Sequence, residues 1–194
     1  MAGNGNIDAV RVWSGADVFV GPTTNDIPTL TDDLLNDADW DLVGFIDEDD
    51  AIGNSVESTD SDLFAYGAIL LRTTSVKEKI SLTFTALENT AVVWDLANPG
   101  SDQSTDTGVT TRIRRGRNIG LAIRSVVLDL EDGDVTSRLY IPRAQILSSG
   151  DRPITDADIA GYPLVLTELA ATDEDGTYFH IELTDDETAE VAGS

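Results

Sequence analysis

Hydrophobic and polar residues alternate with a period of two along much of this chain. The clearest run covers residues 76–87, and only Glu78 interrupts its apolar face. That face carries Val76, Ile80, Leu82, Phe84 and Ala86, and the opposite face carries Lys77, Lys79, Ser81, Thr83 and Thr85. Because successive side chains of a β-strand point to opposite faces, this run predicts a strand with one buried face.

Shorter apolar runs, separated by turn residues, predict further strands. They cover residues 10–13, 16–20, 40–46, 68–74, 119–130, 135–147, 161–172 and 177–183. Three dipeptides typical of tight hairpin turns lie between or within such runs, and these are Ser14-Gly15, Asp132-Gly133 and Asp175-Gly176. Residues 21–39 have the composition of a loop, with clustered Asp, Thr and Pro.

One helix is predicted, over residues 88–97. Asn89 or Thr90 suits its N-cap, and Asn98-Pro99-Gly100 ends it. Helical spacing places three apolar residues on one face, and these are Leu87, Ala91 and Trp94. We expect that face to close a sheet edge or the mouth of a barrel.

These elements predict a mainly β fold, an antiparallel β-sandwich or barrel with one flanking α-helix and long loops or terminal arms. At 194 residues the chain is long enough for one core. Neither an internal repeat nor a linker divides it, so residues 1–194 are expected to form a single domain.

Charge is sorted into three blocks along the chain. Residues 1–71 carry a net −14, residues 72–152 a net +1 and residues 153–194 a net −11, which gives −24 in total. Because so many like charges repel one another, they have to be spread over the surface, screened by salt or neutralised by the positive charge of a partner. One hypothesis is therefore self-assembly, with acidic segments of one copy against the middle block of another.

Composition excludes several classes of protein. The absence of cysteine excludes disulfides, thiolate metal sites and cysteine nucleophiles. No apolar run reaches the roughly 18 residues of a membrane span, and we expect no membrane partner. Residues 1–8 are polar and unlike a signal peptide, so we expect folding and assembly in the cytosol. The strongly acidic balance also disfavours nucleic-acid binding by the outer surface.

No catalytic or cofactor-binding pattern stands out. A Ser-His-Asp arrangement would need His180, the only histidine, which is more simply interpreted as a surface strand residue. The nucleophile elbow, phosphate-binding loop, dinucleotide fingerprint and metalloprotease helix are all missing from the sequence. We therefore expect no enzymatic activity and no cofactor.

Two charged clusters are candidates for contacts between subunits. Residues 47–62 are acidic and polar, which predicts an exposed excursion with a short strand near residues 54–59. The run Asp47, Glu48, Asp49 and Asp50 lacks the spacing of a calcium loop, so a solvated acidic segment is favoured over a metal site. The second cluster is Arg112, Arg114, Arg115 and Arg117. Ion pairing with carboxylates of the same or a neighbouring chain is favoured there over nucleic-acid binding.

An ordered series of motifs occupies residues 40–96. It consists of VGFI at 43–46, DEDD at 47–50, ESTD at 57–60 and TFTALEN at 83–89, the last running straight into the predicted helix. This series resembles the major tail protein, or tail tube protein, of long-tailed phages with non-contractile tails, of siphovirus type. The family's glycine after the acidic pair has only Ala51 or Gly53 near its place here. The segment ADVFVGP at 16–22 is also similar to the family's N-terminal strands.

The resemblance implies a structural virion protein that forms stacked, hexameric rings, located in the virion tail and assembled in the host cytoplasm. It implies contacts with itself, with the tape measure protein, with tail tip and terminator proteins, and transiently with DNA in the lumen. On this sequence the family's extended inter-subunit loop maps to residues 47–66, and its arms to residues 1–8 and 184–194. The candidate interface residues are thus Asp47, Glu48, Asp49, Asp50, Glu57, Asp60, Asp62, Arg112, Arg114, Arg115 and Arg117.

Other interpretations stay open at this point. A salt-adapted acidic β-domain that binds a ligand or a cation, an acidic DNA mimic and a tail terminator protein all fit parts of the pattern. Only two lysines accompany ten arginines, which suits either a halophilic archaeal host or an actinobacterium with a GC-rich genome.

Overall fold

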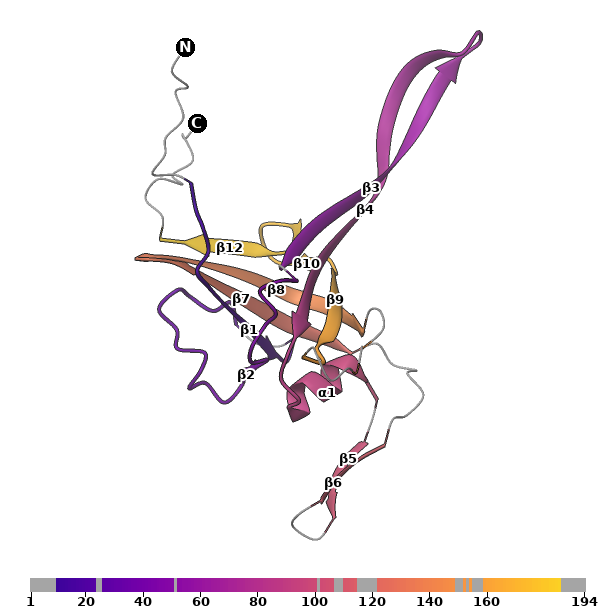
Figure 1. The fold of residues 1–194 in the computed structure, drawn as a ribbon. Coiled ribbons are helices and arrows are strands. Elements are labelled where there is room, and N and C mark those ends of the chain that lie inside the picture. The colour runs from indigo at the N-terminus through magenta and orange to yellow at the C-terminus, as the bar shows by residue number, and fades with distance from the viewer. Residues whose placement is uncertain are drawn as a thin grey trace.

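The structure is a computed structural model that describes residues 10–23, 26–50, 52–100, 102–106, 110–114, 122–148, 152, 154 and 159–185. Its described residues form twelve strands and one helix, so the fold is mainly β, as predicted (Figure 1). The helix is α1 (Ala91–Ala97). The strands are β1 (Gly15–Gly21), β2 (Asp41–Leu42), β3 (Gly53–Ala65), β4 (Ile69–Ala86), β5 (Asp102–Asp106), β6 (Thr110–Arg114), β7 (Ile123–Asp132), β8 (Val135–Ser148), β9 (Tyr162–Glu168), β10 (Ala171–Thr172), β11 (Thr177–Tyr178) and β12 (Ile181–Thr184).

Eight of these strands form one antiparallel sheet. Its order is β2-β1-β7-β8-β9-β4-β3, and β12 pairs with the same edge of β8 that β9 uses further along. The remaining strands make two small hairpins, β5-β6 and β10-β11. Long antiparallel pairings of this kind agree with the antiparallel architecture expected from the alternating pattern.

The sheet closes into a barrel through the segment that follows β2. Val43 donates its backbone N–H to Val18 of β1 at 2.9 Å, and Asp47 donates to Thr85 of β4, also at 2.9 Å. Between them, Ile46 forms a β-bridge with Ala86. Of the two architectures that the sequence left open, the structure has the barrel.

Alternate residues of the strands fill the barrel interior. In β4 the predicted apolar face is confirmed over residues 80–86, since Ile80, Leu82, Phe84 and Ala86 are all buried. The opposite face is not fully exposed as expected, because Ser81 and Thr85 are buried as well. Leu82, Phe84 and Ala86 belong to one core cluster with Val18, Val20, Val126, Leu128, Ile141, Ile146, Leu164 and Leu166. Each such side chain contributes roughly 1.5–3 kcal/mol by leaving water, which makes the barrel the stable part of the molecule.

Helix α1 packs against this core, but not with the predicted face. Its N-cap is Thr90, one of the two residues predicted for that position. The Thr90 hydroxyl accepts a hydrogen bond from the Val93 backbone N–H at 3.3 Å. The buried residues are Val93, Leu96 and Ala97 instead of Leu87, Ala91 and Trp94. With seven residues the helix spans about two turns, too few for spacing alone to define a face. No helix among the described residues is long and apolar enough to cross a membrane.

The predicted hairpins have different outcomes. Gly133 and Gly176 have φ of +63° and +136°, the conformation that favours glycine, and the turns at Asp132-Gly133 and Asp175-Gly176 are confirmed. The Ser14-Gly15 turn is wrong. Residues 10–14 are not a strand, because the chain runs on from Ser14 into β1 beside β7, where Ser14 donates to the Glu131 carbonyl at 2.7 Å.

Candidate assembly interface

A long β-hairpin projects from the barrel. β3 pairs with β4 from Gly53 opposite Thr83 to Ala65 opposite Ile69, whereas β9 accompanies β4 only along residues 81–86. Residues 57–79 therefore form a two-stranded ribbon standing away from the barrel, which we call the arm (Figure 1). Two-stranded ribbons are marginal in water on their own, so an arm of this length favours a partner.

The arm corrects two expectations from the sequence. The extended loop predicted at residues 47–66 is mostly the 13-residue strand β3, and the separate strands predicted at 68–74 and 76–87 are one strand, β4. Both faces of the arm are exposed, so its side chains lack the apolar alternation that marks a half-buried strand. The arm is therefore defined by the backbone pairing of β3 with β4, which a side-chain pattern does not reveal.

The three cations of the arm lie on one face, which also carries Glu57, and the other three carboxylates lie on the opposite face. Register places Lys79 opposite Glu57, Lys77 opposite Thr59 and Arg72 opposite Leu63, so the three cations share one face. The other face carries Asp60, Asp62 and Glu78. Among the described residues, no carboxylate forms an ion pair with any of the three cations.

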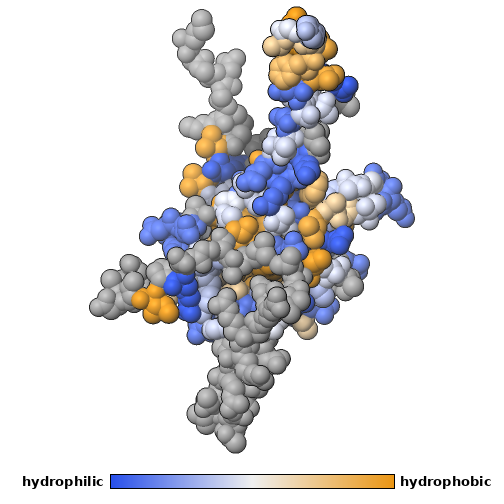
Figure 2. All heavy atoms as spheres, turned by 90° about the vertical axis from the view of Figure 1, so that its right-hand side faces the viewer, coloured by the Kyte–Doolittle hydropathy of each residue, from blue (hydrophilic) through white to orange (hydrophobic). Residues whose placement is uncertain are grey.

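The tip of the arm, residues 63–71, is apolar and exposed. Its six large hydrophobic residues are between 52% and 105% exposed, and they are Leu63, Phe64, Tyr66, Ile69, Leu70 and Leu71. In Figure 2 hydrophobic residues, coloured orange, gather at the end of the arm. A contiguous exposed patch of this kind is typical of a protein–protein contact.

A groove of about 880 Å³ lies at the mouth of the barrel, at the base of the arm. Leu82, Leu128, Leu130 and Leu139 line it, together with acidic residues that include Asp47 and Glu48. We call it the mouth groove.

His180 also lines the mouth groove, and it lies just before β12 and not within a strand as predicted. Its side chain is only 32% exposed, and its Nδ1 lies 2.7 Å from Oε2 of the fully buried Glu168 side chain. The other carboxylate oxygen of Glu168 has no hydrogen-bond partner among the described residues. This pair ties the segment before β12 to β9.

The rest of the predicted acidic run is used locally. Asp47 accepts a hydrogen bond from the Asp49 backbone N–H at 3.1 Å, and Asp50 accepts one from the Thr85 hydroxyl at 2.6 Å. The described residues contain no group of three or more acidic or histidine side chains placed to hold a metal ion.

The described part of the predicted arginine cluster, Arg112 and Arg114, lies on the far side of the barrel from the arm. Arg112 and Arg114 belong to β6, where they stand opposite Ser104 and Asp102 of β5, and this hairpin projects away from the arm (Figure 1). Arg115 and Arg117 lie outside the described residues, as do residues 1–8 and 186–194 of the two predicted terminal arms. Within one chain the arm carboxylates and the strand that carries Arg112 and Arg114 are therefore apart.

The loop that leads into β2, residues 26–41, is rich in exposed carboxylates. We call it the acidic loop, and its six exposed carboxylates are Asp26, Asp32, Asp33, Asp37, Asp39 and Asp41. Leu34 and Trp40 anchor it on the outer face of the sheet. There Trp40 packs edge-on against Tyr140, with ring centroids 6.4 Å apart.

One buried arginine fixes the acidic loop to the barrel. Arg138, 4% exposed, forms a bidentate pair with Asp129, with both N–O distances at 2.6 Å. The same guanidinium donates to the backbone carbonyls of Thr29 and Asp32. Its planar fork of donors suits such a combined contact, which holds the loop in one conformation.

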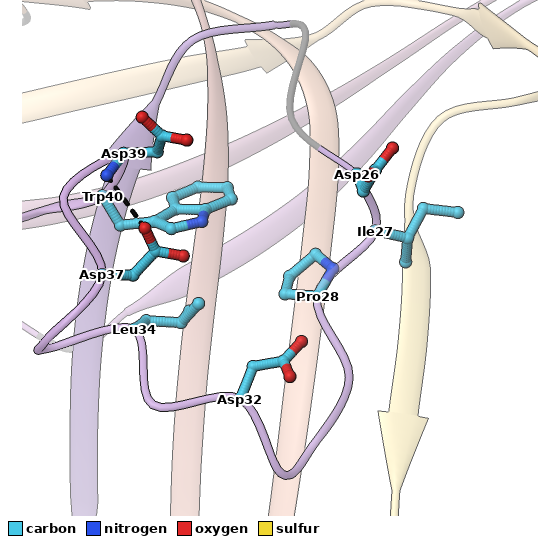
Figure 3. A pocket seen from close by; sticks show the side chains of 8 residues that line it. All are labelled: Asp26, Ile27, Pro28, Asp32, Leu34, Asp37, Asp39 and Trp40. Atoms are coloured by element: carbon cyan, nitrogen blue, oxygen red, sulfur yellow. Dashed lines mark hydrogen bonds between the residues drawn. The ribbon is translucent and has the colours of Figure 1, made fainter.

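A pocket of about 190 Å³ opens in the acidic loop (Figure 3). Its apolar part is formed by Ile27, Pro28, Leu34 and Trp40, and its rim by Asp26, Asp32, Asp37 and Asp39. We call it the loop pocket. Asp37 is held in place by accepting the Asp39 backbone N–H at 3.0 Å.

A comparison with protein families decides what this architecture is. The model of the phage tail tube protein family matches residues 1–191. The chain belongs to the phage tail tube protein family. It is thus a structural, non-enzymatic component of the virion tail, and this confirms at family level the resemblance seen in the sequence. A search of curated proteins found no match.

For a tail tube protein, the sequence had pointed to the arm but missed the acidic loop. Residues 21–39 were expected only to be a loop, and nothing nearby in the sequence indicates that Arg138 holds it. The one local signal is the pair of large apolar residues, Leu34 and Trp40, within an otherwise polar segment. Such residues mark a loop that is packed onto the fold.

Proposed function

We propose that this tail tube protein assembles into stacked rings of six subunits, which form the tube of a long, non-contractile tail of siphovirus type. The observation that carries the proposal is the arm, which leaves a well-packed barrel and ends in six exposed hydrophobic residues. A monomer gains little from such a structure, whereas a neighbouring subunit can cover it.

The positions of the projecting elements support stacking. The arm and the β5-β6 hairpin extend from opposite sides of the barrel (Figure 1). Contacts between different surfaces of identical subunits repeat without limit when they do not close into a ring. The three candidate groups of residues then meet between copies: the acidic turn at 47–50, the arm carboxylates Glu57, Asp60 and Asp62, and the arginines of residues 112–117.

The charge of the protein suits a conduit for DNA. Carboxylates on a lumen wall repel phosphates, so the DNA slides through the tube without sticking to it. The tape measure protein in the lumen, and the tail tip and terminator proteins at the two ends, are the further partners that this role requires.

Removal of the arm tests the proposal. We expect the intact protein to form rings or hollow tubes at high concentration in negative-stain electron microscopy, in low or in molar salt. A variant in which a two-residue turn replaces residues 57–79 should keep the barrel, with a cooperative thermal transition, and form no tubes. Small particles of the intact protein under every condition would contradict the proposal.

A further inference from the structure

The tip of the arm carries a specific combination of groups. Phe64 and Tyr66 provide aromatic rings, and Tyr66 at the apex is fully exposed. Arg72 lies next to the tip, with Lys77 and Lys79 further down the same face of the arm. Its partner should therefore offer an apolar hollow bordered by negative charge.

The loop pocket has this chemistry. Four of the eight residues that line it are apolar and four are aspartates, and the whole acidic loop contains no basic residue. A cavity of about 150 Å³ holds a benzene ring, so the pocket, at about 190 Å³, has room for the ring of Phe64 or Tyr66. Because Arg138 and the packing of Trp40 already fix the loop, docking there costs little further ordering.

The relative position of the two surfaces points to a contact between copies. Figure 1 places the tip of the arm and the acidic loop on opposite sides of the barrel, so one chain cannot join them itself. A head-to-tail contact needs two different surfaces at opposite ends of the subunit. The mouth groove is less suitable, because residues at the base of the arm, Ile52 and Asn54, line it on the arm's own side.

We propose that the tip of the arm of one subunit docks into the loop pocket of a second copy, with its cationic face against the carboxylates of the acidic loop. The inference rests on the proposed stacking and names the surface that receives the arm. In this arrangement the only two lysines of the chain serve a contact between subunits.

Cysteine cross-linking tests the contact directly, since the protein contains no cysteine. One variant carries Tyr66→Cys and another Asp39→Cys, and the two are mixed, assembled and oxidised. We expect disulfide-linked dimers that contain one chain of each variant. The matched control pairs Tyr66→Cys with Glu174→Cys, an exposed turn residue that does not line the loop pocket, and should give at least ten-fold less product.

Charge reversal gives an independent readout. Arg72→Glu with Lys77→Glu should reduce the polymer fraction at least ten-fold in low salt, and so should Asp26→Arg with Asp39→Arg. Combining the four substitutions should restore assembly, because both partners are then reversed. The control is Asp134→Arg with Glu174→Arg, which changes the net charge as much as the two Asp→Arg substitutions in the acidic loop do. Because both residues lie on exposed turns outside the loop, assembly should be unchanged.

The outcomes separate this inference from the proposed function. The docking site alone is overturned if tubes form but no cross-link joins positions 39 and 66, and if the fourfold charge-reversed variant does not regain assembly. Failure of the intact protein to form any higher-order species overturns the proposed function, and the docking site with it. The specific cross-link together with the restored assembly supports both.

Discussion

Strand β4 belongs to two different environments within one continuous element. From Ile80 to Ala86 it lies in the barrel wall, and its apolar face is buried. From Ile69 to Lys79 it lies in the arm, where Ile69, Leu70 and Leu71 are more than half exposed. The same secondary structure is thus stabilised by side-chain burial in one half and by backbone pairing in the other.

This difference separates the two roles of the protein. The barrel folds around its own core, whereas the arm leaves its apolar side chains in water at a cost that only a neighbour removes. Substitutions should therefore divide into those that unfold the subunit and those that only prevent assembly. Matched pairs of one residue type in the two regions test this division.

Arginine provides the comparison with the largest expected effect. Arg138→Ala removes the buried partner of Asp129 and leaves two loop carbonyls without their donor, which should cost about 3–5 kcal/mol of unfolding free energy. Arg72→Ala on the exposed arm should change it by less than about 0.5 kcal/mol. Urea denaturation of dispersed subunits measures both, and equal losses would remove the distinction between barrel and arm.

Leucine gives a second pair within β4 itself. Leu82 is 1% exposed in the barrel, and Leu82→Ala should cost about 2–5 kcal/mol through lost burial and a residual cavity. Leu70 is 52% exposed at the tip, and Leu70→Ala should leave the thermal midpoint of the monomer nearly unchanged while weakening assembly. A large destabilisation of the monomer by the second variant would show that the arm folds against its own chain.

The helix cap should have a smaller effect on the barrel. Thr90→Ala removes the hydroxyl that accepts the Val93 N–H, which should cost about 1 kcal/mol. Thr90→Ser keeps that acceptor and serves as the control, with a denaturation midpoint close to that of the natural protein. Assembly should be unaffected in both variants, since α1 packs into the barrel core and the arm is distant in the fold.

Tyr140 gives the barrel a dependence on alkaline pH. Burial first, and then the charges of Tyr178 and Asp26, raise the pKa of Tyr140 above its usual value of about 10. The folded state therefore holds this proton more tightly than the unfolded chain does. The resulting stability is complete below pH of about 10 and declines as the pH rises through the raised pKa.

Tyr140→Phe should flatten this alkaline decline. The unfolding free energies of the natural protein and of the variant are measured between pH 8 and pH 11, at steps of about one pH unit. The smaller loss of stability in the variant is the contribution of Tyr140. A decline of equal steepness in the two proteins would assign it to other groups.

Several parts of the fold followed from local patterns. The buried face of β4, the turns at Gly133 and Gly176 and the end of the helix at Asn98 each depend on a few neighbouring residues. By contrast, the face of α1 was predicted wrongly, because two turns fit several spacings. Ser14-Gly15 has the composition of a turn, yet Gly15 pairs with Glu131 and the chain runs straight there.

The candidate interface was predicted in part. The segment containing Glu57, Asp60 and Asp62 does project from the barrel, although as a strand and not as a loop. The segment's assignment to contacts between subunits stays a prediction, as does that of the arginines of residues 112–117. The acidic loop was not singled out, because its position depends on Arg138, about a hundred residues away in the chain.

By itself, the sequence determined the strands that face a core, the glycine turns between them and the three blocks of charge. Those properties are local, since a period of two or a glycine at positive φ is encoded within a few residues. Only the tertiary structure decided how far the arm extends, which cations share its face and where the acidic loop lies. Almost every residue type can form backbone hydrogen bonds, so the pairing that builds the arm leaves no pattern in the local sequence. The packing that fixes the acidic loop joins residues distant in sequence, so it leaves no local pattern either.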